Sequence, residues 1–158
     1  MSLARRATPA DAEELVRLRK VMLDACKGPD PDVSWQPTTV EILRKRLADP
    51  DGDLAAFVVD RPGGGGPGAC AVGTIEHRLG SPGNPTGTSG YVFSVATHPD
   101  QRRLGHSRAC MEALLDWFRE RGVVRIDLSA SADAEQLYAS LGFARSPDPA
   151  MRLTLEAL

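Results

Sequence analysis

One stretch of this sequence, Q-R-R-L-G-H-S-R, places Arg102, Arg103 and Arg108 around Gly105. A helical spacing of apolar residues begins just after Ser107. If a helix starts there, its first backbone N–H groups have no intrahelical acceptors, and the positive end of the helix dipole lies beside them. Such groups bind anions, and a glycine lets a phosphate approach the backbone closely. The alternative is a solvated charged turn, and the arginine charges by themselves favour neither interpretation.

The sequence lacks the other common nucleotide and metal motifs. Neither G-x-x-x-x-G-K-[ST] nor G-x-G-x-x-G occurs, and the one dense glycine run lies between two strand-like segments. His98 and His106 have no further ligand at a metal-binding spacing, so we expect no metal site. Cys26, Cys70 and Cys110 are far apart and form no C-x-x-C pair. We therefore expect reduced thiols that serve in packing.

Length and charge limit the class of protein. The 158 residues suit one domain, which we expect to span residues 1–158. Hydrophobic residues make up 42% of the chain and charged residues 25%, as in globular proteins. The net charge of -2 provides no general attraction to nucleic acid or to an anionic membrane. Since we find no signal peptide and no apolar run of about 20 residues, we expect a cytoplasmic protein.

The spacing of apolar and capping residues predicts the elements that position the arginine stretch. Thr8 and Pro9 can start a first helix that ends near Gly28, and Thr38 with Glu41 can cap a second one that ends near residue 47. Further helices are expected at 107–121 and from a cap at Asp133 to Gly142. Strands are expected at Leu3–Ala7, Leu54–Val59, Ala69–Arg78, Tyr91–Thr97, Ile126–Leu128 and Met151–Leu155. This order predicts an α/β (α+β) protein whose three middle strands are antiparallel neighbours.

Two motifs occur in an order and at a spacing that make them informative together. The first is R-R-L-G-H-S over residues 102–107, which fits the pattern [Q/R]-x-x-G-x-[G/A] except at its last position. The second is A-E-Q-L-Y-A-S-L-G-F over residues 134–143, which fits A-x-x-L-Y-x-x-x-G-F. With these motifs the chain resembles the GNAT superfamily of acyl-CoA N-acyltransferases from Tyr91 to Phe143. The resemblance implies the GNAT fold, a central mixed, mostly antiparallel sheet flanked by about four helices.

The resemblance also implies acetyl-CoA as co-substrate, bound where two neighbouring parallel strands separate. In that family the fourth strand pairs through its backbone with the pantetheine arm, which here would involve Val95, Ala96 and Thr97. The pyrophosphate would rest on the backbone N–H groups of the loop that follows. The cofactor-binding residues implied in this loop are Arg102, Arg103, Leu104, Gly105, His106, Ser107 and Arg108. The arginine side chains would add charge-assisted hydrogen bonds to the phosphate oxygens.

One tyrosine and two departures from the family pattern complete the implied cofactor site. Tyr138 matches the position whose hydroxyl commonly protonates the leaving thiolate, and the ordinary pKa values of thiols and phenols, about 8.5 and about 10, are close enough for this. Without the motif, Tyr138 would be interpreted as a partly buried helix residue. Ser107 stands where the family has glycine or alanine, which a helix start tolerates. Ser131 stands where many relatives carry asparagine, and we expect it to make a weaker polar contact with the cofactor.

The acceptor side of the site carries fewer signals. Many relatives place a glutamate on the fourth strand as general base, but here that position is Phe93, followed by Ser94. Glu76 is our candidate, directly or through water, and His77 beside it is another, although each also fits an ordinary strand position. An α-amine with a pKa of about 8 is about 10% neutral at pH 7, whereas a lysine amine is below ~0.1% neutral. We therefore favour a primary amine of low pKa, and Trp35 either lines its pocket or covers the core.

These interpretations predict an N-acetyltransferase that moves an acetyl group directly to a primary amine of a small molecule or peptide. Direct transfer is favoured over a covalent enzyme intermediate because Cys110 falls inside the predicted helix face and not at the cleft. The missing glutamate leaves open a non-catalytic module that binds acyl-CoA, and the arginine stretch leaves open a protein for another phosphate ligand. The identity of the amine, the use of longer acyl chains and the oligomeric state, including a homodimer, stay open at this point.

Overall fold

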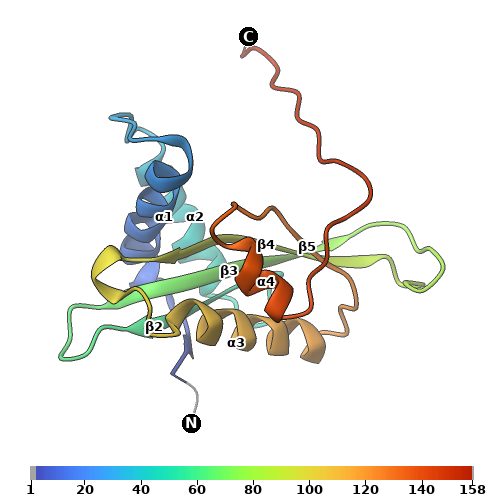
Figure 1. Ribbon diagram of the computed structural model, residues 1–158, viewed down its shortest axis with the longest axis horizontal. Helices are drawn as coiled ribbons and strands as arrows, with labels where there is room; N and C mark the ends of the chain where they lie inside the picture. The colour runs from blue at the N-terminus through green and yellow to red at the C-terminus, as the bar shows by residue number, and fades with distance from the viewer. Residues whose placement is uncertain (1–2, 158) are drawn as a thin grey trace.

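The computed structural model describes residues 3–157, which are arranged around one sheet (Figure 1). In this part of the chain the sheet has five strands in the order β1-β2-β3-β4-β5. Strands β1 to β4 are antiparallel to their neighbours, and β5 is parallel to β4. The strands are β1 (Arg5–Arg6), β2 (Leu54–Asp60), β3 (Pro67–His77), β4 (Thr88–Thr97) and β5 (Ile126–Leu128). The predicted mixed, mostly antiparallel sheet is confirmed.

Four α-helices of the described residues cover the two faces of this sheet (Figure 1). Helices α1 and α2 pack on one face, and α3 and α4 pack on the other. They are α1 (Ala12–Lys27), α2 (Gln36–Leu47), α3 (His106–Glu120) and α4 (Glu135–Ser140), with short 3-10 turns η1 (Pro9–Asp11) and η2 (Pro99–Gln101). Within residues 3–157, none of the helices is both long enough and apolar enough to cross a membrane.

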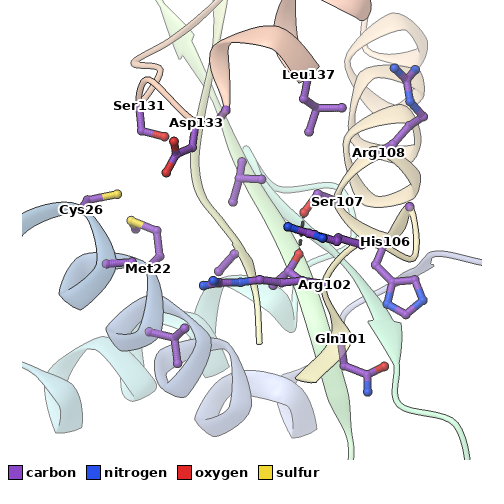
Figure 2. Close-up of a pocket in the computed structure, with 18 of the residues that line it drawn as sticks. Met22, Cys26, Gln101, Arg102, His106, Ser107, Arg108, Ser131, Asp133 and Leu137 are labelled. Carbon is purple, nitrogen blue, oxygen red and sulfur yellow. Dashed lines mark hydrogen bonds between the residues drawn. The ribbon is translucent and has the colours of Figure 1, made fainter. Parts of the chain in front are cut away.

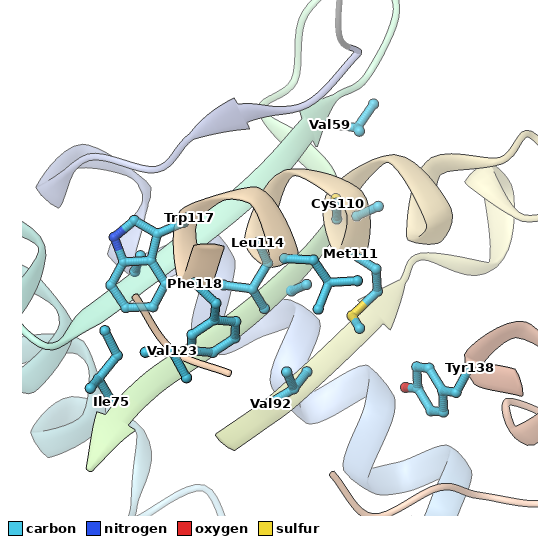
Figure 3. Packing of buried hydrophobic residues seen from close by; sticks show 14 residues of the cluster. Val59, Ile75, Val92, Cys110, Met111, Leu114, Trp117, Phe118, Val123 and Tyr138 are labelled. Carbon is cyan, nitrogen blue, oxygen red and sulfur yellow. The ribbon is translucent and has the colours of Figure 1, made fainter. Parts of the chain in front are cut away.

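Close packing of α3 on β3 and β4 fixes the position of its N-terminus. Phe118, Met111 and Leu114 are fully buried between α3 and the sheet (Figure 3). A Cβ atom added to Gly90 would lie 2.6 Å from the Phe118 ring, and one added to Gly73 would lie 2.8 Å from it. Glycines therefore let the aromatic ring rest on the strands, and burial of such a side chain contributes roughly 1.5–3 kcal/mol.

A bulge bends β4 between its two halves. On β3, Cys70 lies opposite Ala96 and Val72 lies opposite Phe93, so two residue steps on β3 face three on β4. The bulge contains Ser94, whose φ of 49° lies in the left-handed region that non-glycine residues rarely adopt. A bulge of this kind increases the local twist and turns the strand away from its neighbour. The half of β4 that follows the bulge is therefore free to diverge from β5.

Two helix starts differ from the predicted ones. Helix α2 begins before Thr38, because Pro37 fits the first helical turn and brings the start of the helix forward. Helix α4 begins at Glu135, so Asp133 is not its cap. The reason is a backbone turn in which the Ser131 carbonyl accepts hydrogen bonds from the N–H groups of residues 134 and 135. The other predicted elements up to residue 140 are found, with small shifts at their ends.

The predicted last strand, Met151–Leu155, is wrong for the structure of the single chain. Residues 149–157 belong to no helix or strand, and their backbone groups form no hydrogen bond with any other described residue. Their alternating apolar and polar pattern does suit a strand. A strand also needs a neighbouring edge, however, and the segment extends away from the sheet (Figure 1).

Candidate functional site

A cavity of about 860 Å³ lies where β4 and β5 separate (Figure 2). Strand β5 pairs with β4 only at residues 90–92, so on the β5 side no described strand continues beside Val95–Thr97, which line the cavity. The lining residues come from α1, β4, the loop before α3, the first turn of α3 and the turn before α4: Val21, Met22, Ala25, Cys26, Val95, Ala96, Thr97, Gln101, Arg102, Arg103, Gly105, His106, Ser107, Arg108, Ser131, Ala132, Asp133, Ala134 and Leu137. The cavity therefore joins segments that are far apart in the sequence.

The loop between β4 and α3 presents its backbone N–H groups to this cavity. Gly105 precedes α3 with a φ of 77°, and Arg103 has a φ of 64°. A Cβ atom on Gly105 would meet nothing within 4 Å, so it is the positive φ and not crowding by other residues that favours glycine here. None of the backbone N–H groups of residues 103–108 donates a hydrogen bond to another described residue. Together with the positive end of the helix dipole, these groups can bind an anion.

A hydrogen bond between two side chains holds this loop at both ends. Thr97 Oγ1 and Ser107 Oγ lie 2.5 Å apart, and they join the last residue of β4 to the first turn of α3. The backbone N–H of Ala109 donates to the Gly105 carbonyl at 3.1 Å, which is the first hydrogen bond of the helical ladder. Ser107 thus uses its hydroxyl in a way that the glycine or alanine of the family pattern cannot. The departure from the pattern fastens the loop.

The three arginines of the loop differ in their partners. Arg108 bonds to Ser140 of α4 and lies 3.4 Å from Glu112. Arg102 and Arg103 form no ion pair or side-chain hydrogen bond with any other described residue. Figure 2 shows Arg102 extending across the cavity toward α1. Two of the three guanidinium groups are therefore available to an anion bound at the loop, and the third braces α3 against α4.

His106 and Leu104 are placed less directly toward the cavity. His106 is only 9% exposed, and its Nδ1 atom has no hydrogen-bond partner among the described residues. Its ring points away from Cys26 in Figure 2. The Leu104 side chain is 56% exposed, and this residue is not among those that line the cavity. Among residues 3–157 there is no group of three or more His, Cys, Asp or Glu side chains that could hold a metal ion.

Tyr138 lies in the core under α4, and unlike its neighbour Leu137 it is not among the residues that line the cavity. Its side chain is 7% exposed, and its ring packs edge-on against Phe143 with 6.0 Å between the ring centres. Figure 3 shows the ring reaching from α4 toward β4. Burial, and in addition the nearby Cys26, raise the pKa of Tyr138 above its ordinary value of 10.0. The phenol therefore keeps its proton at neutral pH and can act as a hydrogen-bond donor.

The cysteines have two different environments. Cys70 and Cys110 are buried, as predicted, and burial raises the pKa of Cys70 to about 12 and holds the pKa of Cys110 well above its usual range. Cys26 is exposed and lines the cavity, so its prediction as a packing residue is wrong. Met22, one turn before Cys26, packs partly against the core under α1 and also lines the cavity. This end of the apolar stripe extends past the sheet, which spacing alone does not show.

The structure does not bring the candidate base into the cavity. Glu76 lies opposite Ser89, toward the other end of β4, and its carboxylate accepts a hydrogen bond from Arg78 Nε at 2.8 Å. It is absent from the lining residues. Its neighbour His77 faces Asp53, with 3.2 Å between Nε2 and Oδ2. Both residues therefore have the surface ion-pair role of ordinary strand residues in this structure.

Aromatic residues and an arginine surround the bulge on the face covered by α1 and α2. Phe93 packs in the apolar cluster under α1 and α2, and its ring stacks on Tyr91 with 6.2 Å between the centres. Ser94 is 6% exposed and accepts a hydrogen bond from Arg19 of α1. Trp35 packs against the same cluster and also lines a separate cavity of about 240 Å³ near the α1–α2 connection. Trp35 therefore covers part of the core, and the cavity that it lines is separate from the one between β4 and β5.

Comparisons with known proteins agree with this geometry. The model of the family described as "Acetyltransferase (GNAT) family" matches residues 19–143. An acetyltransferase from Clostridium acetobutylicum, solved with acetyl-CoA, superposes with a TM-score of 0.82 at 23% identity and covers 98% of this chain and 96% of its own. A GCN5-related N-acetyltransferase from Ralstonia eutropha JMP134 superposes with a TM-score of 0.79 at 24% identity. The superposition covers 95% of this chain and 97% of that protein. At these identities the superpositions show a shared fold.

A shorter match links the chain to a curated protein. The [ribosomal protein bS18]-alanine N-acetyltransferase of Escherichia coli (strain K12) is 42% identical over 55 residues. The match spans 33% of this chain and 37% of the length of that protein.

Proposed function

Because this chain belongs to the acetyltransferase (GNAT) family, we propose that it transfers an acetyl group from acetyl-CoA directly to a primary amine of a small molecule or peptide. The observation that carries this proposal is the row of unpartnered N–H groups at the start of α3, beside the open edge of β4. Acetyl-CoA combines a pyrophosphate with an arm that contains amide groups. The pyrophosphate can bind to the N–H groups of a helix N-terminus, and the amide groups of the arm can pair with a strand edge.

The residues present fit acetyl-CoA. The N–H groups of residues 103–108 would donate hydrogen bonds to the pyrophosphate, with Arg102 and Arg103 near its oxygens. The free backbone edge of Val95–Thr97 would pair with the pantetheine amides, and Ser131 offers a hydroxyl on the opposite wall. The cavity volume of about 860 Å³ lies within the usual range for ligand pockets, roughly 300–1,000 Å³.

Tyr138 would act as the proton donor of the reaction. Acetyl-CoA supplies an acyl thioester, whose carbonyl carbon is open to attack by a neutral amine. The pKa of Tyr138 is raised by burial, so its Oη atom carries a proton at neutral pH and can give it to a departing thiolate. Its packing against Phe143 holds the ring in place during this step. Cys70 and Cys110 lie in the core, so Cys26 is the one described thiol at the cavity where a covalent intermediate could form.

We extend the proposal to the class of acceptor. No carboxylate stands at Phe93, and Glu76 is paired with Arg78 outside the cavity lining, so neither of these two positions supplies a base for a strongly basic amine. An α-amine is already about 10% neutral at pH 7 and needs little help. The Escherichia coli relative is named for the N-acetylation of an alanine, which agrees with an α-amine. We also propose that this protein acts in the cytoplasm.

An amine panel tests this function. The protein is incubated with acetyl-CoA and with single α-amines, peptides or lysine-type amines, and the released CoA thiol is measured. We expect release with at least one α-amine at a rate well above the amine-free control. The matched control is Gly105→Glu, which introduces a side chain and a negative charge at a left-handed position of the loop and should abolish acetyl-CoA binding.

The rival functions give different results in the same experiments. A non-catalytic acyl-CoA-binding module, suggested by the missing glutamate at Phe93, would bind acetyl-CoA but release no thiol with any amine. A protein for another phosphate ligand would gain melting temperature from inorganic phosphate or ATP as well as from acetyl-CoA. We expect a gain from acetyl-CoA alone.

A further inference from the structure

Arg19 of α1 is a half-buried cation that forms no ion pair with any residue in the range 3–157. Its Nη1 group donates a hydrogen bond to Ser94 Oγ, and its other N–H groups donate to no described residue. The next residue, Lys20, by contrast pairs with Asp24 at 2.8 Å. A guanidinium that is partly removed from water is rarely left without a counter-charge. Most of the donors of Arg19 are therefore available to an anion from outside the chain.

On α1, Arg19 lies between the residues that line two cavities. Met22 and Cys26 follow it by one and two turns and line the main cavity (Figure 2). Leu23, on the other side of Arg19 around the helix, lines the cavity of about 240 Å³ near the α1–α2 connection, together with Trp35. Arg19 is not itself a lining residue of either one. It stands where the two come closest along the helix.

On β4, the partner of Arg19 marks one end of the main cavity. Ser94 directly precedes Val95, which is the first residue of this strand on the cavity wall. The anion-binding loop follows the other end of the strand, after Thr97. Under the proposed function, the pyrophosphate lies at that loop and the arm of acetyl-CoA runs back along the strand. Its acyl end, and with it the attacking amine, would then lie toward Arg19.

The strand offers no counter-charge to this guanidinium. None of the residues of β4 (Thr88–Thr97) is charged. Phe93, where many relatives have a glutamate, instead packs in the apolar cluster under α1 and α2. Ser94 is 6% exposed, and its carbonyl accepts a hydrogen bond from the buried Cys70 thiol at 3.1 Å. The bulge therefore holds the end of Arg19 in place without neutralising it.

We infer that Arg19 binds a carboxylate of the acceptor, so that this protein selects primary amines that carry a carboxylate a few bonds from the amine. The inference rests on the proposed acetyl transfer and narrows its acceptor class. A free α-amino acid has this carboxylate on the carbon that carries the amine. A peptide that begins with aspartate or glutamate has it in the first side chain. A guanidinium suits either one, because its planar N–H groups can donate two parallel hydrogen bonds to one carboxylate.

The same contact would help the amine to lose its proton. A carboxylate close to an ammonium group stabilises the charged form, and a guanidinium close to both opposes this effect. Binding to Arg19 therefore lowers the pKa of the acceptor amine relative to its value in free solution. The contact thus compensates in part for the absence of a base at Phe93 and Glu76.

Acceptor pairs that differ by one charge test the inference. L-alanine is compared with L-alaninamide, and a dipeptide amide that begins with aspartate is compared with one that begins with asparagine. For each pair, thiol release gives the ratio of kcat/KM for the charged acceptor to that for the neutral one, per neutral amine. We expect this ratio to fall by about tenfold or more in Arg19→Gln for at least one pair, since hydrogen bonds to charged groups are the strong ones. The pair that responds identifies the position of the carboxylate.

Arg17→Gln is the matched control on the same helix. It removes the same charge from an exposed side chain that pairs with Glu14, and the ratio should not change. If Arg19 only holds the bulge through Ser94, Arg19→Gln lowers kcat/KM equally for both members of each pair. An unchanged ratio for both pairs in Arg19→Gln, or an equal fall in Arg17→Gln, would overturn the inference.

Product binding gives a readout that needs no turnover. With CoA present, the acetylated carboxylate compound should raise the melting temperature of the wild type more than its acetylated amide, and the difference should disappear in Arg19→Gln. Equal shifts from both members of each pair in the wild type would refute the inference, even if the variant does not fold. If no amine releases thiol but this difference is found, the proposed acetyl transfer fails and the carboxylate site at Arg19 stands.

Discussion

Thr97 Oγ1 and Ser107 Oγ lie 2.5 Å apart, one at the end of β4 and the other in the first turn of α3. This contact closes the loop whose N–H groups have no acceptor among the described residues. The strand edge and the helix N-terminus on the two sides of the loop are therefore held at a constant separation. A ligand that uses both must fit that separation.

Ser107→Ala should weaken acetyl-CoA binding roughly fivefold. A hydrogen bond contributes about 1 kcal/mol net, and a loss of about 1 kcal/mol in binding free energy raises the Kd by roughly that factor. The free energy of unfolding should fall by about 0.5–1.5 kcal/mol. Thr97→Val removes the other partner and should have a similar effect, and the double variant should be no worse than either single one. Calorimetric titration with acetyl-CoA measures this. Additive losses would show that the two hydroxyls do not act together.

Tyr138→Phe should lower kcat roughly 100-fold, because a positioned proton donor contributes at least about that much. The ring contact with Phe143 stays, so the melting temperature and the Kd for acetyl-CoA should not change. Since burial raises the pKa of Tyr138 above 10.0, more than half of this phenol keeps its proton at pH 10.0, and the loss of kcat from its deprotonation should have its midpoint above that pH. Activity within twofold of the wild type would remove Tyr138 from its proposed role.

Cys26 should react with a thiol reagent in the folded protein, and acetyl-CoA should slow the reaction, because this thiol lines the cavity. Cys70 and Cys110 should stay unreactive until the protein unfolds, since burial raises both pKa values and blocks access. The absorbance of the released chromophore measures how many thiols react and how fast each of them reacts.

Cys26→Ser should keep kcat within about twofold of the wild type if the amine attacks the thioester directly. Mass spectrometry after incubation with acetyl-CoA and no acceptor is the second measurement. An acetyl group on Cys26, together with loss of activity in the variant, would instead establish a covalent enzyme intermediate.

Asp11→Asn should lower the free energy of unfolding at pH 7 by about 1–3 kcal/mol. Burial would raise the pKa of Asp11, but hydrogen bonds from the Arg5 guanidinium at 2.9 Å and from the Thr8 backbone N–H at 2.8 Å outweigh it and hold this pKa below 3.8. A lowered pKa stabilises the fold above the unfolded value of 3.8, and this stabilisation disappears as the pH falls through the folded value.

Urea unfolding at pH 7 and pH 3 tests this sign. The difference between the wild type and Asp11→Asn should be larger at pH 7. Asp60→Asn removes the more exposed partner of Arg5 and should lower the free energy of unfolding by less than Asp11→Asn does. Equal differences at both pH values would mean that the Asp11 charge does not stabilise the fold.

Local patterns predicted much of the fold and the main binding loop. Gly105 and the apolar spacing after Ser107 are signals within a few residues, because a helix N-terminus leaves its first N–H groups free wherever it occurs. The predicted helix start at Thr8 is confirmed for the same reason, since Asp11 is three residues away and its carboxylate accepts a hydrogen bond from the Thr8 N–H. Signals of this kind need no knowledge of the rest of the chain.

Other parts of the site depended on contacts that sequence spacing does not contain. Met22 and Cys26 continue an apolar stripe, and only the crossing of α1 past the sheet turns them toward the cavity. Glu76 has the carboxylate that a general base needs, but it pairs with Arg78 and lies on β3 far from the bulge. Its residue type therefore suggested a role that its position does not support. The segment Met151–Leu155 has the alternating pattern of a strand. A strand must also pair with a sheet edge, and this segment extends away from the sheet (Figure 1).

The sequence by itself determined the order of elements up to α4, the position of the loop around Gly105 and the family to which the chain belongs, because each depends on residues close together along the chain. Only the tertiary structure decided which residues share the cavity and how far β4 separates from β5. That separation follows from the bulge at Ser94, whose left-handed backbone depends on packing against β3 and α1, and not on its local sequence.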